Sequence, residues 1–158
     1  MTTITKLKKI EGNFYNWSAK NGIVLLRICI GIVFFWFGFQ KFFPGVSSAE
    51  DLATRTIEVM TFGLMAPRLS VFLLALWETI IGIGFLTGKF MRATIALLFL
   101  QMIGTFTPLF FFPAETFFVV PIVPTLEGQY IIKNIVIISA AMIIAAYYAG
   151  KTIKKQAK

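Results

Sequence analysis

One carboxylate, Glu78, lies in the middle of an apolar run that is long enough to form a membrane helix, residues 69–86. A charged side chain at the centre of a bilayer costs about 3 kcal/mol on insertion scales. Such a group normally faces the interior of a helix bundle, pairs with a cation or lines a functional cavity. Glu78 is therefore the first residue to consider as part of a polar site.

Arg27, which lies inside the first apolar run, is a candidate partner for Glu78 because its long side chain could reach inward. The sequence leaves three alternatives open. The two residues could form a buried ion pair that fixes helix register. Glu78 could instead belong to a ligand site, or be protonated and unpaired. The ion pair and the ligand site are compatible with each other.

Further polar side chains lie within the apolar runs or at their ends: Lys41, Gln101, Lys133 and Asn134. Gln101, which shares a helix side with Thr105, either makes an interhelical hydrogen bond or lines a pocket with Glu78. Lys41 and Lys133 are predicted at the same side of the membrane, and Lys133 could simply snorkel to the interface. Alternatively, they form a positive mouth above Glu78 that suits an anionic or quinone-like head group.

A quinone site needs a slot for the ring and one or two donors for its carbonyl oxygens. Trp36, Trp77 and the numerous phenylalanines could supply the slot, with Lys41, Lys133 or Gln101 as donors. Ordinary packing against lipid and core explains most of these aromatic residues more simply. Quinone is therefore a hypothesis, and the sequence requires no cofactor.

The composition is that of an integral membrane protein. Of 158 residues, 58% are hydrophobic and 14% are charged, and the mean hydropathy is +0.82. Apolar runs at 22–39, 69–86, 91–112 and 129–149 are each long enough to cross about 30 Å of hydrocarbon as a helix. Because the runs do not alternate with period two, a β-barrel is excluded. The sequence predicts an all-α fold with one four-helix membrane domain, residues 21–150.

Three glycines are expected to mediate helix packing. Gly31 and Gly38 lie on one stripe of the first span with Arg27 and Lys41, and Gly82 shares a face of the second span with Glu78. Small residues let the backbones of membrane helices approach closely. The sequence therefore predicts close contacts of these helix faces within the bundle.

The distribution of Lys and Arg predicts the orientation, since cytoplasmic loops collect these residues. Basic residues are concentrated in a tail at 1–20, in the short connection with Lys89 and Arg92, and in a second tail at 151–158. Both tails are expected in the cytoplasm. The connections around 40–68 and 113–128 carry most of the acidic residues and are expected on the outer side.

The outer connections also contain local signals. Ser47 to Glu50 matches a helix capping box, which predicts a short interfacial helix that either covers the outer mouth or rests on lipid. Pro108 and Pro113 should kink or end the third helix. Residues 113–124 are expected to form an aromatic flap at the level of the head groups.

The sequence excludes several kinds of chemistry. With one cysteine and no histidine, this chain alone cannot build a disulfide relay, a bis-histidine haem site or the usual zinc and copper sites. Cys29 is expected to be buried and inert. The basic excess flanks the spans, so we expect no nucleic-acid partner. We expect neither a removable signal peptide in the polar first 20 residues nor a self-contained enzyme.

The motifs together resemble the DoxX family of small four-helix membrane proteins. The resemblance rests on Arg27 with Gly31, on FWFGFQKF at 35–42, on Trp77-Glu78 followed by Gly82 and Gly84, and on GQYIIKNI at 128–135. The last segment is similar to the branch that contains the inner-membrane protein of reactive-chlorine resistance. Many members carry a histidine where this chain has Phe37, so a role that depends on that histidine is not expected here.

The resemblance implies a multi-pass protein of the bacterial cytoplasmic membrane. It also implies a link to redox stress or to quinone-linked sulfur oxidation, where a relative is a subunit of thiosulfate:quinone oxidoreductase. The positions that carry over from the family are Arg27, Gly38, Lys41, Glu78, Lys133 and Asn134.

Three functions follow as hypotheses. The first is an accessory membrane subunit that binds a small lipophilic or anionic molecule, such as a quinone, or docks a redox partner protein. The second is a proton-coupled transporter or channel, which four short helices could form as a homo-oligomer. The third is a factor that assembles a larger membrane protein. In every case the lipid bilayer is an expected partner.

Overall fold

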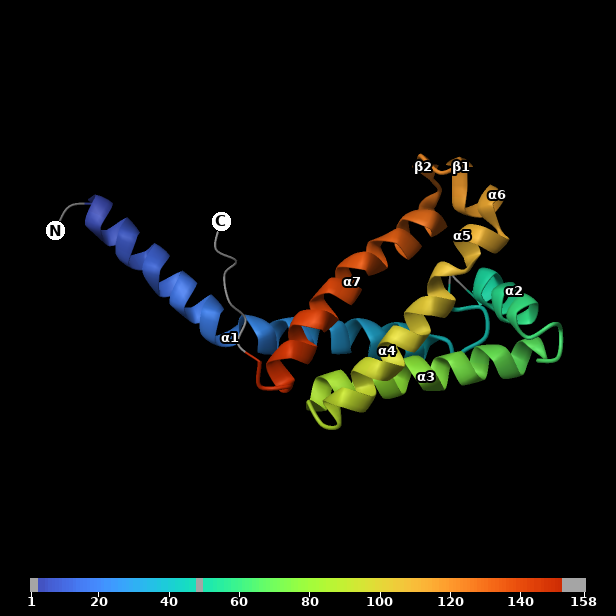
Figure 1. The fold of residues 1–158 in the computed structure, drawn as a ribbon, viewed down its shortest axis with the longest axis horizontal. Helices are drawn as coiled ribbons and strands as arrows, with labels where there is room; N and C mark the ends of the chain where they lie inside the picture. The colour runs from blue at the N-terminus through green and yellow to red at the C-terminus, as the bar shows by residue number, and fades with distance from the viewer. Residues whose placement is uncertain (1–2, 48–49, 152–158) are drawn as a thin grey trace.

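The computed structural model describes residues 3–47 and 50–151. Four helices are long and apolar enough to cross a membrane: α1 (Thr3–Gln40), α3 (Pro67–Thr87), α4 (Met91–Phe106), which continues into α5 (Pro108–Phe111), and α7 (Leu126–Tyr148). They lie against one another in a bundle (Figure 1). The chain is a four-helix membrane protein of the all-α class.

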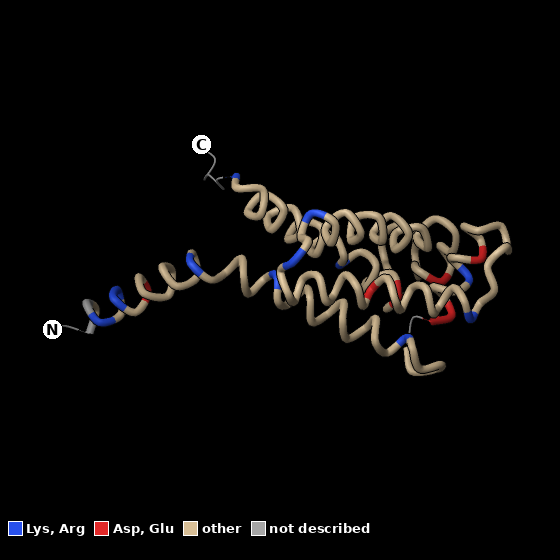
Figure 2. The backbone as a smooth tube through the Cα atoms, turned by 90° about the horizontal axis from the view of Figure 1, so that it is seen from below, with Lys and Arg blue, Asp and Glu red and all other residues tan. Residues whose placement is uncertain are grey.

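The short elements gather at one end of the bundle, which we call the hairpin end (Figure 1). They are α2 (Glu50–Met60), α5, α6 (Pro113–Thr116) and a two-stranded antiparallel hairpin of β1 (Phe117–Val119) and β2 (Val123–Pro124). The opposite end, the terminal end, contains the α3–α4 turn and the end of α7. The N-terminal part of α1 extends beyond that end (Figures 1 and 2).

The first helix differs from the prediction. The sequence placed a polar tail at 1–20 before a span at 22–39, whereas α1 is a single helix of 38 residues that begins at Thr3. Lys6, Lys8, Lys9 and Lys20 are compatible with a helix because lysine has good helix propensity. Hydropathy does not reveal the N-terminal part of this helix, because its polar residues lower the mean hydropathy without breaking the helical backbone.

The other boundaries follow local chemistry. Gly88, with φ +70°, ends α3 in the left-handed conformation that favours glycine. Pro108 interrupts the third span, as predicted: α4 ends at Phe106 and a short α5 follows. The short helix predicted in the first connection is present as α2. Its predicted capping box includes Ser48 and Ala49, which lie outside the described residues.

The connection after α5 is not simply an aromatic flap. It forms α6 and then the β1–β2 hairpin, where Phe118 and Ile122 are both 77% exposed. The lysines at 154, 155 and 158 of the predicted second tail lie outside the described residues.

The glycines set the register of the contact between α1 and α3. A Cβ atom added to Gly38 would lie 2.7 Å from the Thr79 nitrogen, and one added to Gly31 would lie 2.8 Å from the Leu86 nitrogen. Gly82 lies in the same way against the backbone of Phe35. Only glycine permits such close backbone approach. The two antiparallel helices are therefore in tight contact along several turns.

The buried core lies between the four helices. Ile30 and Phe34 of α1 meet Ile81 and Phe85 of α3, and Leu98 of α4 lies among them. Ala141 and Ile144 complete the cluster from α7. This apolar core lies mainly in the half of the bundle between Glu78 and the terminal end.

Candidate functional site

Glu78 pairs with Lys41 in the structure. The Lys41 Nζ atom lies 2.6 Å from the Glu78 Oε2 atom, and the two residues are only 8% and 9% exposed. The Lys41 ammonium also donates to the Phe37 carbonyl at 3.4 Å. Because the two charges neutralise each other, this part of the interior carries no net charge.

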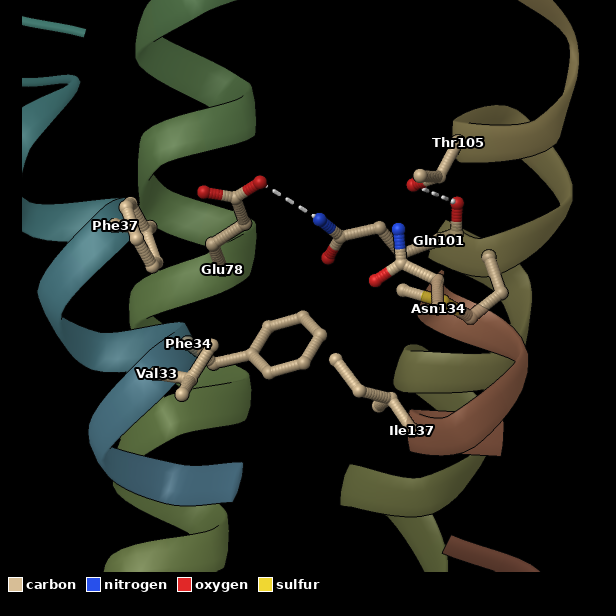
Figure 3. Close-up of a pocket in the computed structure, with 9 residues that line it drawn as sticks. Val33, Phe34, Phe37, Glu78, Gln101, Thr105, Asn134 and Ile137 are labelled. Carbon is tan, nitrogen blue, oxygen red and sulfur yellow. Dashed lines mark hydrogen bonds between the residues drawn. The ribbon is translucent and has the colours of Figure 1, made fainter. Parts of the chain in front are cut away.

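Gln101 is the second partner of the carboxylate. Its Nε2 atom donates to Glu78 Oε1 at 2.9 Å, so each carboxylate oxygen accepts one hydrogen bond (Figure 3). This contact fixes the orientation of the amide, since a flipped amide would place two acceptor oxygens against each other. The Gln101 Oε1 atom is buried and has no hydrogen-bond partner among the described residues.

Arg27 does not pair with Glu78, so that alternative is wrong. Its Nη1 atom donates to the carbonyl oxygens of Phe85 and, at 3.0 Å, of Leu86, near the end of α3. Basic side chains commonly bind the last carbonyl groups of a helix in this way. The glycine register places residue 27 opposite residue 90, which is about 18 Å of helical rise from residue 78.

A pocket of ≈ 150 Å³ lies beside the Lys41–Glu78–Gln101 cluster (Figure 3). All four spanning helices contribute to its wall: Val33, Phe34 and Phe37 from α1, Glu78 from α3, Gln101, Met102 and Thr105 from α4, and Asn134 and Ile137 from α7. Val33 and Phe37 are 41% and 54% exposed, so the pocket is accessible from the lipid-facing side of the bundle.

Asn134 brings a second amide to this pocket. Its Nδ2 atom donates to the carbonyls of Tyr130 at 3.0 Å and Ile131 at 3.1 Å, within its own helix. Its oxygen is left to face the pocket (Figure 3). The Thr105 hydroxyl donates to the Gln101 backbone carbonyl at 3.0 Å. The polar atoms that remain available to a ligand are therefore mainly acceptors.

Two of the predicted site residues lie elsewhere. Lys133 is exposed and its Nζ atom lies 5.5 Å from the ring centre of Tyr130, so it does not form a positive mouth with Lys41. Trp36 is 62% exposed, and Trp77 donates from Nε1 to the Leu97 carbonyl at 3.2 Å. The predicted tryptophan slot is therefore not formed.

Cys29 also differs from the prediction, because it is exposed on α1 rather than buried. It lies on the side of the span that the other described helices leave free. Within residues 3–47 and 50–151, no group of three or more His, Cys, Asp and Glu side chains is placed to hold a metal ion.

The pairing of Lys41 with Glu78 was missed although both residues were singled out. The available signal was the glycine spacing: with Gly31 and Gly38 against one side of α3, the outer end of α1 lies nearer to Glu78 than Arg27 does. The sequence carries no such signal for Phe34, Phe37 and Ile137, because an apolar residue beside a pocket cannot be distinguished by sequence from any other core residue.

A second ionic cluster holds the short elements together at the hairpin end. Arg55 of α2 binds Glu115 of α6 through two hydrogen bonds of 2.6 and 2.5 Å, and its guanidinium lies 5.1 Å from the ring centre of Phe112. The Arg55 hydrogen bonds lower the pKa of Glu115, and the Glu115 hydrogen bond raises the pKa of Arg55. This cluster fastens α2 to the connection after α5.

The comparisons with known proteins give one match. A family model described as DoxX matches residues 22–114, which is more than half of the chain. The matched region extends from the middle of α1 into α6 and includes Lys41, Glu78 and Gln101, whereas Asn134 lies beyond it. No curated protein and no solved structure matches the chain significantly.

Proposed function

The chain belongs to the DoxX family, and we propose that it is a membrane protein that binds the hydroxylated ring of a lipophilic molecule beside Glu78. The observation that carries this proposal is the buried Oε1 atom of Gln101, a residue of the pocket wall: this atom has no hydrogen-bond partner within the described part of the chain. An unpartnered buried acceptor costs free energy that a bound donor can recover.

The size of the pocket favours one ring. An apolar cavity of about 150 Å³ can hold a benzene molecule, and the pocket beside Glu78 measures ≈ 150 Å³. Phe34 and Phe37 supply aromatic surface at its wall. A long apolar tail would not fit inside, but it could leave along the exposed side chains of Val33 and Phe37 into the lipid.

The hydrogen-bonding groups favour a donor ligand. The Lys41 ammonium is engaged by Glu78 and the Phe37 carbonyl. The Gln101 amide donates to Glu78, while its oxygen remains available. A quinone offers only carbonyl acceptors, whereas a phenol or a quinol offers hydroxyl donors. We therefore propose a phenol-type ring, such as the reduced head group of a quinone.

The neutral ion pair disfavours a free anion. A ligand with a net charge would be desolvated beside a carboxylate that is already paired. This argues for a neutral ring over the anionic ligand that the sequence also allowed. A redox-linked accessory role, in which the protein holds a quinol for a partner, is the form of this proposal that fits the family resemblance.

A path for ions through one copy has less support. On the terminal side of the pocket the interior is filled by apolar side chains, among them Phe34, Ile81 and Phe85. We further propose the bacterial cytoplasmic membrane as the location, with both termini in the cytoplasm. Lys20, Lys89, Arg92 and Lys151 support this orientation, because they lie at or beyond the terminal end of the bundle.

Ring binding can be measured on the purified protein in nanodiscs, with phenol, hydroquinone under anaerobic conditions, benzoquinone and anisole. We expect phenol and hydroquinone to bind more tightly than anisole and benzoquinone, which lack the donor. Gln101→Leu should weaken phenol binding about fivefold, which corresponds to about 1 kcal/mol for one net hydrogen bond. Trp36→Leu is the control because Trp36 does not line the pocket. Equal binding of phenol and anisole would contradict the proposal.

A further inference from the structure

The N-terminal part of α1 carries apolar side chains that no other described element covers. Leu7, Ile10, Phe14 and Trp17 are 59%, 65%, 61% and 54% exposed. This part of the helix projects away from the bundle (Figure 2). Large exposed apolar surfaces on a helix that leaves the membrane mark an interaction site.

These side chains belong to a regular stripe. Positions alternate by three and four residues over three heptads, in the order Leu7, Ile10, Phe14, Trp17, Asn21, Val24 and Ile28. A mean spacing of 3.5 residues is the pattern of a coiled-coil seam. We call this stripe the heptad face. Leu7, Phe14, Asn21 and Ile28 occupy its a positions.

The heptad face is not the face that packs inside the bundle. Ile30 and Phe34 of α1 lie in the core, and residues 28 and 30 point about 200° apart around a helix. The stripe ends near Ile28, one turn before Gly31 contacts α3. The heptad face therefore remains free when the four-helix bundle is complete.

We propose that the heptad face pairs with the same face of a second copy, forming a parallel two-stranded coiled coil and hence a homodimer. Two copies inserted in the same orientation present their α1 helices in parallel. A single asparagine at an a position, here Asn21, is a known determinant of register and of the two-stranded state. In the single chain the Asn21 Nδ2 atom donates to the Trp17 carbonyl of its own helix at 3.0 Å.

Charges beside the stripe fit this arrangement. Lys6 precedes Leu7 at a g position, and Glu11 follows Ile10 at an e position. In a parallel coiled coil, a g residue lies near the e residue five positions later in the other chain. Lys6 of one copy therefore meets Glu11 of the other, twice per dimer.

A lipid surface is a poorer partner for the heptad face. The helical backbone of α1 is uninterrupted from Thr3 to Gln40; the helix bends before it enters the bundle, and its N-terminal part projects away from the other helices (Figure 1). A helix that continues from a span lies flat on a leaflet only after a sharp kink, and such kinks occur at prolines, Gly/Ser pairs and π-bulges. The described part of α1 contains no proline.

Cysteine cross-linking in proteoliposomes tests the proposal. In a Cys29→Ser background, Ile10→Cys places a thiol at a d position, and Gly12→Cys places it on the opposite side, where no atom lies within 4 Å. We expect efficient dimer cross-linking for Ile10→Cys and at least fivefold less for Gly12→Cys. Equal cross-linking of the two variants, or none for Ile10→Cys, would overturn the homodimer.

The charge pairs provide a second test that does not depend on cysteine geometry. Glu11→Lys should lower the dimer association constant about fivefold, because two attractive pairs become repulsive. Lys6→Glu combined with Glu11→Lys should restore it. Failure of the double variant to recover would overturn the parallel register. In a Trp36→Phe and Trp77→Phe background, strong quenching of Trp17 fluorescence by brominated lipid would show that the face lies on the membrane and would also overturn the proposal.

Discussion

At the scale of single residues, Glu78 is tolerated in an apolar interior because both of its oxygens are occupied. Lys41 and Gln101 each supply one hydrogen bond, at 2.6 and 2.9 Å. A buried pair of this kind contributes little relative to apolar residues of the same shape, but the loss of one partner is costly. Substitution of Lys41 or Glu78 alone is therefore expected to be costly.

Removal of Lys41 alone should be strongly destabilising. Lys41→Met leaves the Glu78 carboxylate buried without its cation, and we expect a loss of about 3 kcal/mol in the free energy of unfolding. The measurement is equilibrium unfolding in mixed micelles. Glu78→Gln in the same chain should recover most of the loss. Lys133→Met is the matched control, because Lys133 is exposed; a similar loss there would argue against the pair.

Sequence reasoning located the polar residues of the site but not their partners. Glu78, Gln101 and Asn134 stand out because polar groups are rare in membrane spans. Which cation meets Glu78 depends on how far one helix is shifted along another. That shift is set by backbone contacts at Gly31, Gly38 and Gly82, and Arg27 would need a further shift of about 18 Å to reach the level of Glu78.

At the scale of helices, the glycines of the α1–α3 contact hold the cluster in register. Gly82 lies against the backbone of Phe35, and an added Cβ would come 2.6 Å from the Phe35 Cα atom. That neighbour is backbone and cannot rotate away, so the helices must separate if the glycine gains a side chain. Such a separation would also move Lys41 relative to Glu78.

Gly82→Ala should therefore destabilise the protein. We expect a loss of about 2 kcal/mol from overpacking, measured by the same unfolding experiment. Gly104→Ala is the control, since no atom lies within 4 Å of a Cβ at Gly104. That substitution should be neutral or mildly stabilising, because alanine has the better helix propensity. Equal effects of the two substitutions would contradict a tight α1–α3 contact.

The Arg55–Glu115 contact predicts how the hairpin end responds to acid. The pKa of Glu115 is lowered by Arg55 in the folded protein. The contact therefore stabilises the fold above the ordinary glutamate pKa of about 4.3. That contribution is lost as the pH falls through the lowered folded value. The protection of the α2 amides, taken relative to intrinsic exchange at each pH, should be unchanged from neutral pH to about 5 and should then fall in stronger acid.

Glu115→Gln supplies the reference for this pH dependence. The variant should show low amide protection in α2 already at neutral pH, with little further change in protection on acidification. A wild-type profile that is indistinguishable from that of Glu115→Gln would show that the ion pair does not hold α2 in place.

At the scale of the whole molecule, composition was sufficient to predict four membrane helices but not the full length of α1. The four apolar runs all fall within the range of about 17 to 25 residues that a membrane helix needs, so their existence follows from hydropathy alone. The N-terminal part of α1 is helical without being apolar enough to be counted. The β1–β2 hairpin is too short to leave a periodic pattern in the sequence.

The proposed orientation makes a prediction about the two ends. In inside-out and right-side-out vesicles of a Cys29→Ser background, Lys89→Cys reports the terminal end and Ile122→Cys reports the hairpin. With cytoplasmic termini, an impermeant maleimide should label Ile122→Cys from outside intact cells and Lys89→Cys only in inverted membranes. The reverse pattern would contradict the orientation.

The most direct test of ring binding is native mass spectrometry on the protein extracted from its own membrane in mild detergent. We expect a bound small molecule with an aromatic hydroxyl group, present in the wild type and in Trp36→Leu. The same species should be lost or strongly reduced in Gln101→Leu. A spectrum with only phospholipid, identical for the wild type and Gln101→Leu, would contradict a ring-binding site beside Glu78.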